Sequence, residues 1–300
     1  MLAAARSPVV PALFVALAAV SQEVGAAFAV GLFTALGAVG AVFARFLVAG
    51  LILGVAVRPR VLGLTSRAWL AVVALACTLT AMNVCFYFAL TRIPLGVAVT
   101  VEVLGPLTLS VLVSRRRSAW LWAGLALTGV ALLSLTGVRF GRMDPVGLVF
   151  AAGAAVGWAG YIIASSRAAT DFGNLDALAI ASMMGALATA PFAVLSVDPH
   201  AALRWEVLGL GVTVGVMSSV IPYSLELISL RHLPQETFAV VTCLSPVIAA
   251  LAGWLILGQH LAVTGYVAIV LVTAASIGAV HSASGRRWPP ASLPWARAGQ

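Results

Sequence analysis

Charged residues are scarce in this 300-residue chain, and lysine is absent altogether. Only 9% of the residues are charged, against about a quarter in a soluble domain, while 62% are hydrophobic. The mean hydropathy is +1.10. This composition excludes an ordinary soluble domain and predicts an all-α polytopic membrane protein. The net charge of +8 comes from arginines that stand singly or in short clusters between apolar stretches, a pattern that does not indicate nucleic-acid binding.

Signatures of enzymes and metal sites are also missing. The three cysteines, Cys77, Cys85 and Cys243, are spaced neither for a disulfide framework nor for a metal site. No glycine loop of the phosphate-binding type occurs, which excludes an ATP-driven pump for this chain alone. The sequence therefore predicts no cofactor, no metal and no enzyme. A lipid-modifying membrane enzyme is a less favoured alternative, because no acid–base or metal set converges at the headgroup level.

What the chain does contain is an internal repeat marked by prolines. Pro94 and Pro106 recur 140 residues later as Pro234 and Pro246. In both copies an arginine stands shortly before the first proline, and an apolar stretch leads to the second. Prolines that break apolar helices at matching places in two halves are typical of a secondary transporter built from two repeats.

Breakers and charges divide the chain into ten apolar stretches, and a helix needs about 20 such residues to cross a bilayer. The predicted spans are 8–31, 37–57, 68–90, 94–114, 119–138, 145–165, 175–196, 205–229, 235–257 and 261–281. The first span is longer than a signal peptide and is expected to stay uncleaved. We expect five helices in residues 1–140, five in residues 141–281, and a disordered cytoplasmic tail over 282–300.

The arginines predict the orientation of these spans, because short cytoplasmic loops carry the excess of basic residues. With the N-terminus inside, twelve of the 17 arginines fall on the cytoplasmic face. Four fall on the outer face, namely Arg92, Arg139, Arg142 and Arg204. Both termini are therefore expected in the cytoplasm, at the inner (plasma) membrane. Because five spans is an odd number, the second half enters the bilayer from the opposite side, which predicts an inverted repeat.

Four charged residues fall well inside predicted spans: Glu23, Arg45, Glu102 and Glu226. Such a charge costs roughly 2.5–3.5 kcal/mol on insertion scales, so each needs a partner or a wet cavity. Glu102 stands one turn before Gly105 and Pro106, and a proline frees the carbonyl a turn earlier. Glu102 is thus the first candidate for binding substrate and proton. The alternatives are a packing role for this carboxyl and a structural role for Arg45.

Polar and aromatic side chains accompany these charges at helical spacing. Asn83 pairs with Tyr87, Trp158 with Tyr161, and Tyr223 with Glu226, so each pair shares one helix face. We expect Glu102 and these residues to face a common central space that forms the substrate and proton pathway, together with Glu23 and Arg45. The expected helix breaks and hinges are Pro94, Gly105, Pro106, Pro222, Pro234 and Pro246.

Several of these stretches resemble the EamA-type transporters of the drug/metabolite transporter superfamily, and within it the threonine/homoserine exporters of the bacterial inner membrane. They are Met82-Asn83-Val84-Cys85-Phe86-Tyr87, Glu102-Val103-Leu104-Gly105-Pro106 and Pro222-Tyr223-Ser224-Leu225-Glu226. The likeness extends over about residues 10 to 281. It implies a ten-helix, two-repeat exporter of small amino acids or related metabolites, driven by the proton gradient.

Two departures from the family pattern bear on the substrate. Ser245 stands where the family usually has a glutamate before the second-half proline. Glu23 stands where glutamine is usual, with Val30 where a lysine tends to follow. The charged residues of the expected site thus stand at other positions than in the family pattern, so the substrate can differ from threonine and homoserine. A drug or aromatic-compound exporter of the same fold is the alternative, favoured by a mostly apolar cavity.

The predicted topology can be tested with reporter fusions. Fusions after Arg60, Arg117 and Arg167 should read cytoplasmic, since these arginines lie in predicted inner loops. Fusions near Arg142 and Asp198 should read external. Paired alkaline phosphatase and fluorescent reporters at each point measure this, and a cytoplasmic reading at Arg142 would contradict the ten-span arrangement.

Overall fold

The computed structural model describes residues 9–59, 61, 63–114, 117–135, 144–169, 172, 175–230 and 241–283. Within these ranges every regular element is a helix, which confirms the predicted all-α class. Five helices are long and apolar enough to cross a membrane. The elements are α1 (Val9–Val57), α2 (Ser66–Leu90), α3 (Leu95–Glu102), α4 (Leu104–Ser114), α5 (Arg117–Leu135), α6 (Pro145–Ala168), α7 (Asp176–Ser196), α8 (Pro199–Ala202), α9 (Trp205–Gly215), the π-helix η1 (Val216–Val220), α10 (Ile221–Leu230), α12 (Ser245–Leu257) and α13 (Val263–Ala283).

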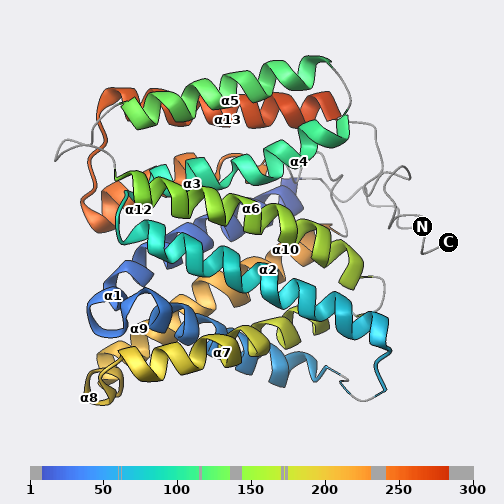
Figure 1. Ribbon diagram of the computed structural model, residues 1–300, viewed down its shortest axis with the longest axis vertical. Helices are drawn as coiled ribbons and strands as arrows, with labels where there is room; N and C mark the ends of the chain where they lie inside the picture. Colours follow the sequence, from blue (N-terminus) through green and yellow to red (C-terminus); the bar gives the residue numbers. More distant parts are fainter. Residues whose placement is uncertain are drawn as a thin grey trace.

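Helices from the two halves of the chain pack against each other rather than forming separate bundles. α2 lies along α6, α1 packs on α7 and on α9 through α10, and α3 contacts α12. α5 and α13 lie side by side along one edge of the bundle (Figure 1). The interior at these contacts consists mostly of alanine, valine and leucine. The centre of the molecule is therefore lined by both halves.

The longest helix, α1, consists of two helical segments that meet at Gly37. Gly37 has φ 64° and ψ 177°, a backbone conformation that is essentially restricted to glycine. Nothing lies within 4 Å of the position that a Cβ atom would take there, so the need for glycine is conformational. The break falls where the sequence predicts the boundary between the first two spans.

The predicted proline breaks lie at helix starts and interruptions. Pro94 is the N-cap of α3, Pro222 is the second residue of α10, and Pro246 is the second residue of α12. The predicted span 94–114 is divided between α3 and α4 at Val103, three residues before Pro106. Pro234 and the predicted tail beyond Ala283 lie outside the described residues.

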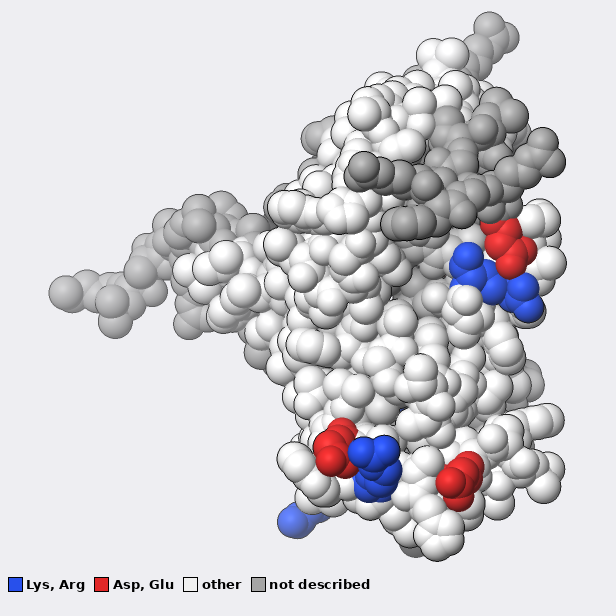
Figure 2. Space-filling view, turned by 90° about the vertical axis from the view of Figure 1, so that its left-hand side faces the viewer, with Lys and Arg blue, Asp and Glu red and all other residues white. Residues whose placement is uncertain are grey.

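Charged side chains of the described residues are few on the surface. Figure 2 shows one end of the bundle, where they occupy a few separate places on an otherwise uncharged face. Arg92, after α2, donates a hydrogen bond of 2.9 Å to Asp144, which caps the start of α6 through the N–H of Val146. The Arg92 guanidinium, followed by the Val146 N–H, holds the pKa of the exposed Asp144 carboxyl below its usual range. This pair joins the end of α2 to the start of the second half.

Gly105 allows α4 to approach α6 closely. A Cβ atom at this position would overlap the carbonyl oxygen of Ala155 in α6. That carbonyl is part of a helix backbone, so it cannot rotate away as a flexible side chain could. The predicted importance of Gly105 at this helix break thus has a steric basis in the contact between α4 and α6.

Replacing Gly105 by alanine should destabilise the fold. Overpacking of this kind costs about 1–3 kcal/mol, and we expect a lower apparent melting temperature and a lower yield of monodisperse protein in detergent. Gly124→Ala in α5 is the matched control, because a Cβ atom there meets nothing within 4 Å. Equal melting temperatures for the two variants would show that the contact between α4 and α6 is looser than described.

Candidate functional site

A small polar cavity lies among the helices of both halves. Its volume is about 30 Å³, close to the space of a single water molecule. Four elements supply its lining: α1, α2, α3 and α10. The lining residues are Gln22, Glu23, Ala26, Arg45, Met82, Asn83, Phe86, Glu102 and Tyr223. Two carboxyl groups and one guanidinium therefore meet in the interior of a chain that has few charges anywhere.

The guanidinium of Arg45 is held by the π-helix η1. Its Nε donates to the hydroxyl oxygen of Ser219 at 3.0 Å, and its Nη2 donates to the carbonyl oxygen of Ser218 at 2.6 Å. Its central carbon lies 5.9 Å from the centre of the Tyr87 ring, within the range of a cation–π interaction. Arg45 itself is buried. These contacts fix the position of the cation beside the cavity.

The carbonyl groups of Met217 and Ser218 have no α-helical N–H partner within their own helix, because the helix is interrupted there. Residue 222 is proline and has no N–H, so it cannot bond the carbonyl of Ser218 four residues earlier. The N–H of Ile221 bonds the carbonyl of Val216 in the π-helical pattern. The carbonyl of Met217 instead accepts a hydrogen bond of 2.8 Å from Ser21 in α1. Ser21 and Arg45 of α1 thus donate hydrogen bonds to the two carbonyl groups that the irregular turn leaves without a helical partner.

The two carboxyl groups of the cavity are buried without a salt bridge to Arg45. Glu23 is 2% exposed and Glu102 is 8% exposed. The ion pairs between described residues are Arg92 with Asp144 and Arg204 with Glu206, both at the surface. Glu102 is the last residue of α3, and its own carbonyl cannot bond Pro106 in the helical pattern. Both carboxyl groups are placed to bind a cation or a proton that enters the cavity.

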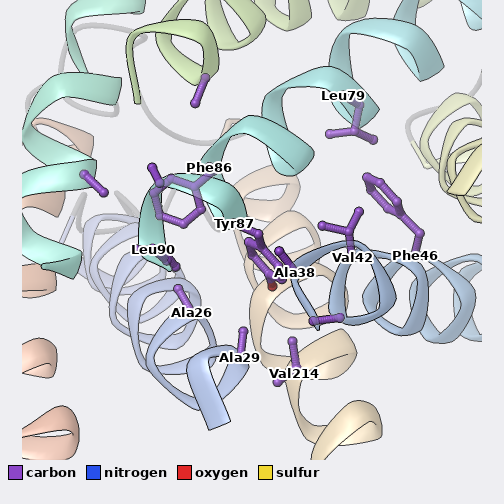
Figure 3. Packing of buried hydrophobic residues seen from close by; sticks show 14 of the residues in the cluster. Ala26, Ala29, Ala38, Val42, Phe46, Leu79, Phe86, Tyr87, Leu90 and Val214 are labelled. Atoms are coloured by element: carbon purple, nitrogen blue, oxygen red, sulfur yellow. The ribbon is translucent and has the colours of Figure 1, made fainter. Parts of the chain in front are cut away.

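Asn83 and Tyr87 of α2 complete the surroundings of the charged groups. Asn83 lines the cavity and donates from Nδ2 to the Leu79 carbonyl of its own helix at 2.8 Å. Tyr87 is fully buried, and Figure 3 shows its ring among Ala26, Ala29 and Ala38 from the two segments of α1. Its hydroxyl makes no close hydrogen bond to a described residue but lies near the guanidinium of Arg45. Tyr87 thus packs behind the cavity wall, against Arg45.

The remaining predicted residues lie outside the lining of this cavity. Tyr161 of α6 is close enough to Tyr223 and Glu226 of α10 for an electrostatic interaction. Glu226 stands one turn beyond Tyr223 on the same helix, and Trp158 is half-buried on α6. The structure therefore brings together Glu23, Arg45, Asn83, Glu102 and Tyr223, while a pathway role for Trp158, Tyr161 and Glu226 stays a prediction.

Sequence reasoning missed the residues that hold Arg45 and the residue that ties α1 to the Met217 carbonyl of η1. They are Ser218 and Ser219 for Arg45, and Ser21 for Met217. Serines are common in apolar helices and carry no signal of their own. The available signal was Pro222, since a proline leaves the carbonyl four residues earlier without a partner. Gln22, Met82 and Phe86 of the lining are neighbours of predicted residues. No group of three or more metal-ligating side chains occurs within the part of the chain that the structure describes.

The chain is similar to known proteins both in sequence and in fold. A sequence profile of the EamA-like transporter family matches residues 145–280. The chain is 34% identical over 268 residues to the threonine/homoserine exporter RhtA of Escherichia coli (strain K12), covering 89% of this chain and 90% of that protein. Identity to the threonine/homoserine exporter RhtA of Salmonella typhimurium (strain SL1344) is 33% over the same coverage.

A solved crystal structure of a protein 21% identical in sequence has the same fold. It aligns with a TM-score of 0.61 over 91% of this chain and 96% of its own length. At that identity the likeness concerns the fold alone. The relatives at 33–34% identity cover 89% of the chain. The chain therefore belongs to the EamA-like transporter family.

Proposed function

We propose that the protein is a secondary active exporter of small amino acids, of the threonine and homoserine kind, across the inner membrane. It works by alternating access and exchanges its substrate for protons. The observation that carries this proposal is the buried cavity in which Glu23, Glu102 and Arg45 meet. An amino acid is a zwitterion, and this cavity offers acidic and basic side chains for its two charged ends. Without such groups, a charged solute would be excluded from the membrane interior.

The carboxyl groups serve the ammonium end of the substrate and the coupling proton. Glu102 is buried at a helix end whose backbone is interrupted, so it can be reached when α3 and α4 shift. An ionised Glu102 binds the substrate ammonium, and a protonated Glu102 does not. Proton and amino acid therefore compete for one group, which couples the inward flow of one to the outward flow of the other.

The size of the cavity supports alternating access. A space of about 30 Å³ holds a water molecule and is too small for an amino acid. Substrate must enter by a separation of the helices that line it, and these helices come from both halves of the chain. Rocking of one half against the other opens such a site to one side of the membrane at a time.

Contacts between the halves support the inverted repeat. Gly50 of α1 faces Met183 of α7, and Gly185 of α7 faces Phe46 of α1. The later residue of α1, Gly50, contacts the earlier residue of α7, Met183, and the earlier residue Phe46 contacts the later residue Gly185. The two segments are therefore antiparallel. Each presents a glycine to a large residue of the other, as two segments related by a two-fold axis do.

Grouping the elements by their breaks supports a count of ten spans. α1 counts as two spans that meet at Gly37, α3 with α4 as one, and α9 through α10 as one. The other spans are α2, α5, α6, α7, α12 and α13. With both termini in the cytoplasm, as the arginines indicate, the second set of five spans is inverted relative to the first.

The polar lining favours an amino acid over an aromatic or drug-like substrate. Met82, Phe86 and Tyr223 offer apolar surface, but three formally charged side chains share the same small space. A site for an apolar compound would leave these buried groups without partners, at a cost that a charged substrate avoids.

Efflux from cells tests the proposal. Cells that express the protein should export preloaded radiolabelled threonine or homoserine faster than cells without it, and an uncoupler should remove the difference. Glu102→Gln keeps the shape of the side chain and removes its charge. We expect this variant to reach the membrane in normal amount and to export at the rate of cells that lack the protein.

Glu206→Gln is the matched control, since Glu206 is exposed at the start of α9 and far from the cavity lining. It should export at the wild-type rate. Wild-type efflux from Glu102→Gln would assign Glu102 to packing and direct the search for the coupling group to Glu23 and Glu226. Absence of amino-acid efflux from the unaltered protein would overturn the proposed substrate class.

A further inference from the structure

We propose that Arg45 binds the carboxylate of the substrate and that Ser218 and Ser219 position its guanidinium for this task. The inference rests on the proposed export of amino acids and assigns the second end of the zwitterion to a particular side chain. The arrangement makes the substrate carboxylate a requirement for recognition. It also gives the irregular η1 turn a function in specificity.

The close hydrogen bonds of Arg45 involve its Nε and Nη2 atoms, and no carboxylate is bound to the guanidinium. A guanidinium has five N–H groups, with parallel pairs on its Nε–Nη2 edge and on its Nη1–Nη2 edge. Ser219 and the Ser218 carbonyl occupy the Nε–Nη2 edge. Nη1 makes no close hydrogen bond to a described residue, although the hydroxyl groups of Tyr87 and Tyr223 lie near the guanidinium. These neutral groups supply no anion, and the Arg45 side chain lines the cavity. The second edge matches a carboxylate, which accepts two parallel hydrogen bonds from such a pair.

Arg45 also forms no ion pair with a described residue. A buried cation without a bound anion is costly, and carbonyl, hydroxyl and ring contacts offset that cost only in part. Glu23 and Glu102 line the same cavity and are close enough to interact with Arg45 electrostatically, yet neither is in direct contact with it as an ion pair. A substrate carboxylate at the second edge supplies the anion and leaves the two carboxyl groups for the ammonium and the proton.

The alternative role for Arg45 is that of a brace for the interrupted helix. Its bonds to Ser218 and Ser219 join α1 to η1, and α1 is also joined to η1 by the bond from Ser21 to Met217. A brace would affect stability and membrane insertion. A carboxylate-binding residue would also affect which compounds are recognised. Specificity therefore separates the two roles.

The test uses full-length protein in proteoliposomes loaded with unlabelled threonine, with counterflow of labelled threonine as the readout. Competitors are threonine and threoninol, which has a hydroxymethyl group in place of the carboxylate and keeps the ammonium. A charge-assisted pair contributes about 1.5–3 kcal/mol, so threoninol should compete about 10- to 100-fold more weakly with the unaltered protein. Equal competition by the two compounds would overturn the proposal without any variant.

Arg45→Gln should remove this discrimination. The KM for threonine should rise about 10- to 100-fold, and the ratio between the two competitors should fall to about one, because the charge-assisted pair is lost. Arg204→Gln is the control, since it removes an arginine from the exposed surface. An unchanged competitor ratio in Arg45→Gln, with a lower melting temperature, would assign Arg45 to bracing and leave the proposed function intact.

Ser219→Ala tests the positioning role with a smaller change. It removes the partner of Nε and keeps the cation, so the KM for threonine should rise several-fold at a similar maximal rate. Ser224→Ala is the matched control, because Ser224 lies on α10 and its hydroxyl donates to the Val220 carbonyl of the preceding helix turn. A wild-type KM and competitor ratio in Ser219→Ala would refute positioning by Ser219. No counterflow of threonine or homoserine by the unaltered protein would instead refute the proposed function.

Discussion

The hydrocarbon of a membrane offers the backbone no hydrogen-bond partner, and this constraint decides where the helices can be interrupted. Each carbonyl that loses its helical N–H must find another donor inside the protein. Pro222 deprives the Ser218 carbonyl of its partner, and Arg45 of α1 supplies the missing donor. Ser21 does the same for the Met217 carbonyl. The interruption and the polar residues of α1 are therefore parts of one arrangement, and neither is stable in lipid without the other.

This arrangement depends on how closely the helices approach. Lipid gives packed helices little hydrophobic driving force, so contact and small side chains hold them together. The cluster at the interior is rich in alanine, and Gly105 brings α4 against the backbone of α6. Such interfaces deform little, and motion is expected as shifts of whole helices. The helix interruptions at Gly37, at Val103 and at the η1 turn all adjoin helices that line the cavity.

Much of this fold could be predicted from the sequence, because its signals are local. Apolar length defines the helices, and the prolines at 94, 106, 222 and 246 mark their interruptions. Charge in an apolar stretch singled out Glu23, Arg45 and Glu102, which line one cavity in the structure. Ser21, Ser218 and Ser219 could not be identified in this way, since a serine becomes significant only when a free carbonyl or a cation lies opposite it. Helical spacing placed Trp158 and Tyr161 on one face, but it cannot say which neighbouring helix covers that face.

The chemistry of the site follows from the unequal surroundings of its charged groups. Arg45 is held by hydrogen bonds to η1, whereas Glu23 and Glu102 form no ion pair with a described residue. In the proposed function the fixed cation binds the substrate carboxylate. The carboxyl groups exchange the substrate ammonium for a proton, because either one satisfies a buried carboxylate. The proposal thus assigns recognition of the carboxylate and coupling to the proton to different residues of one small cavity, and it implies that a substitution can alter one while leaving the other.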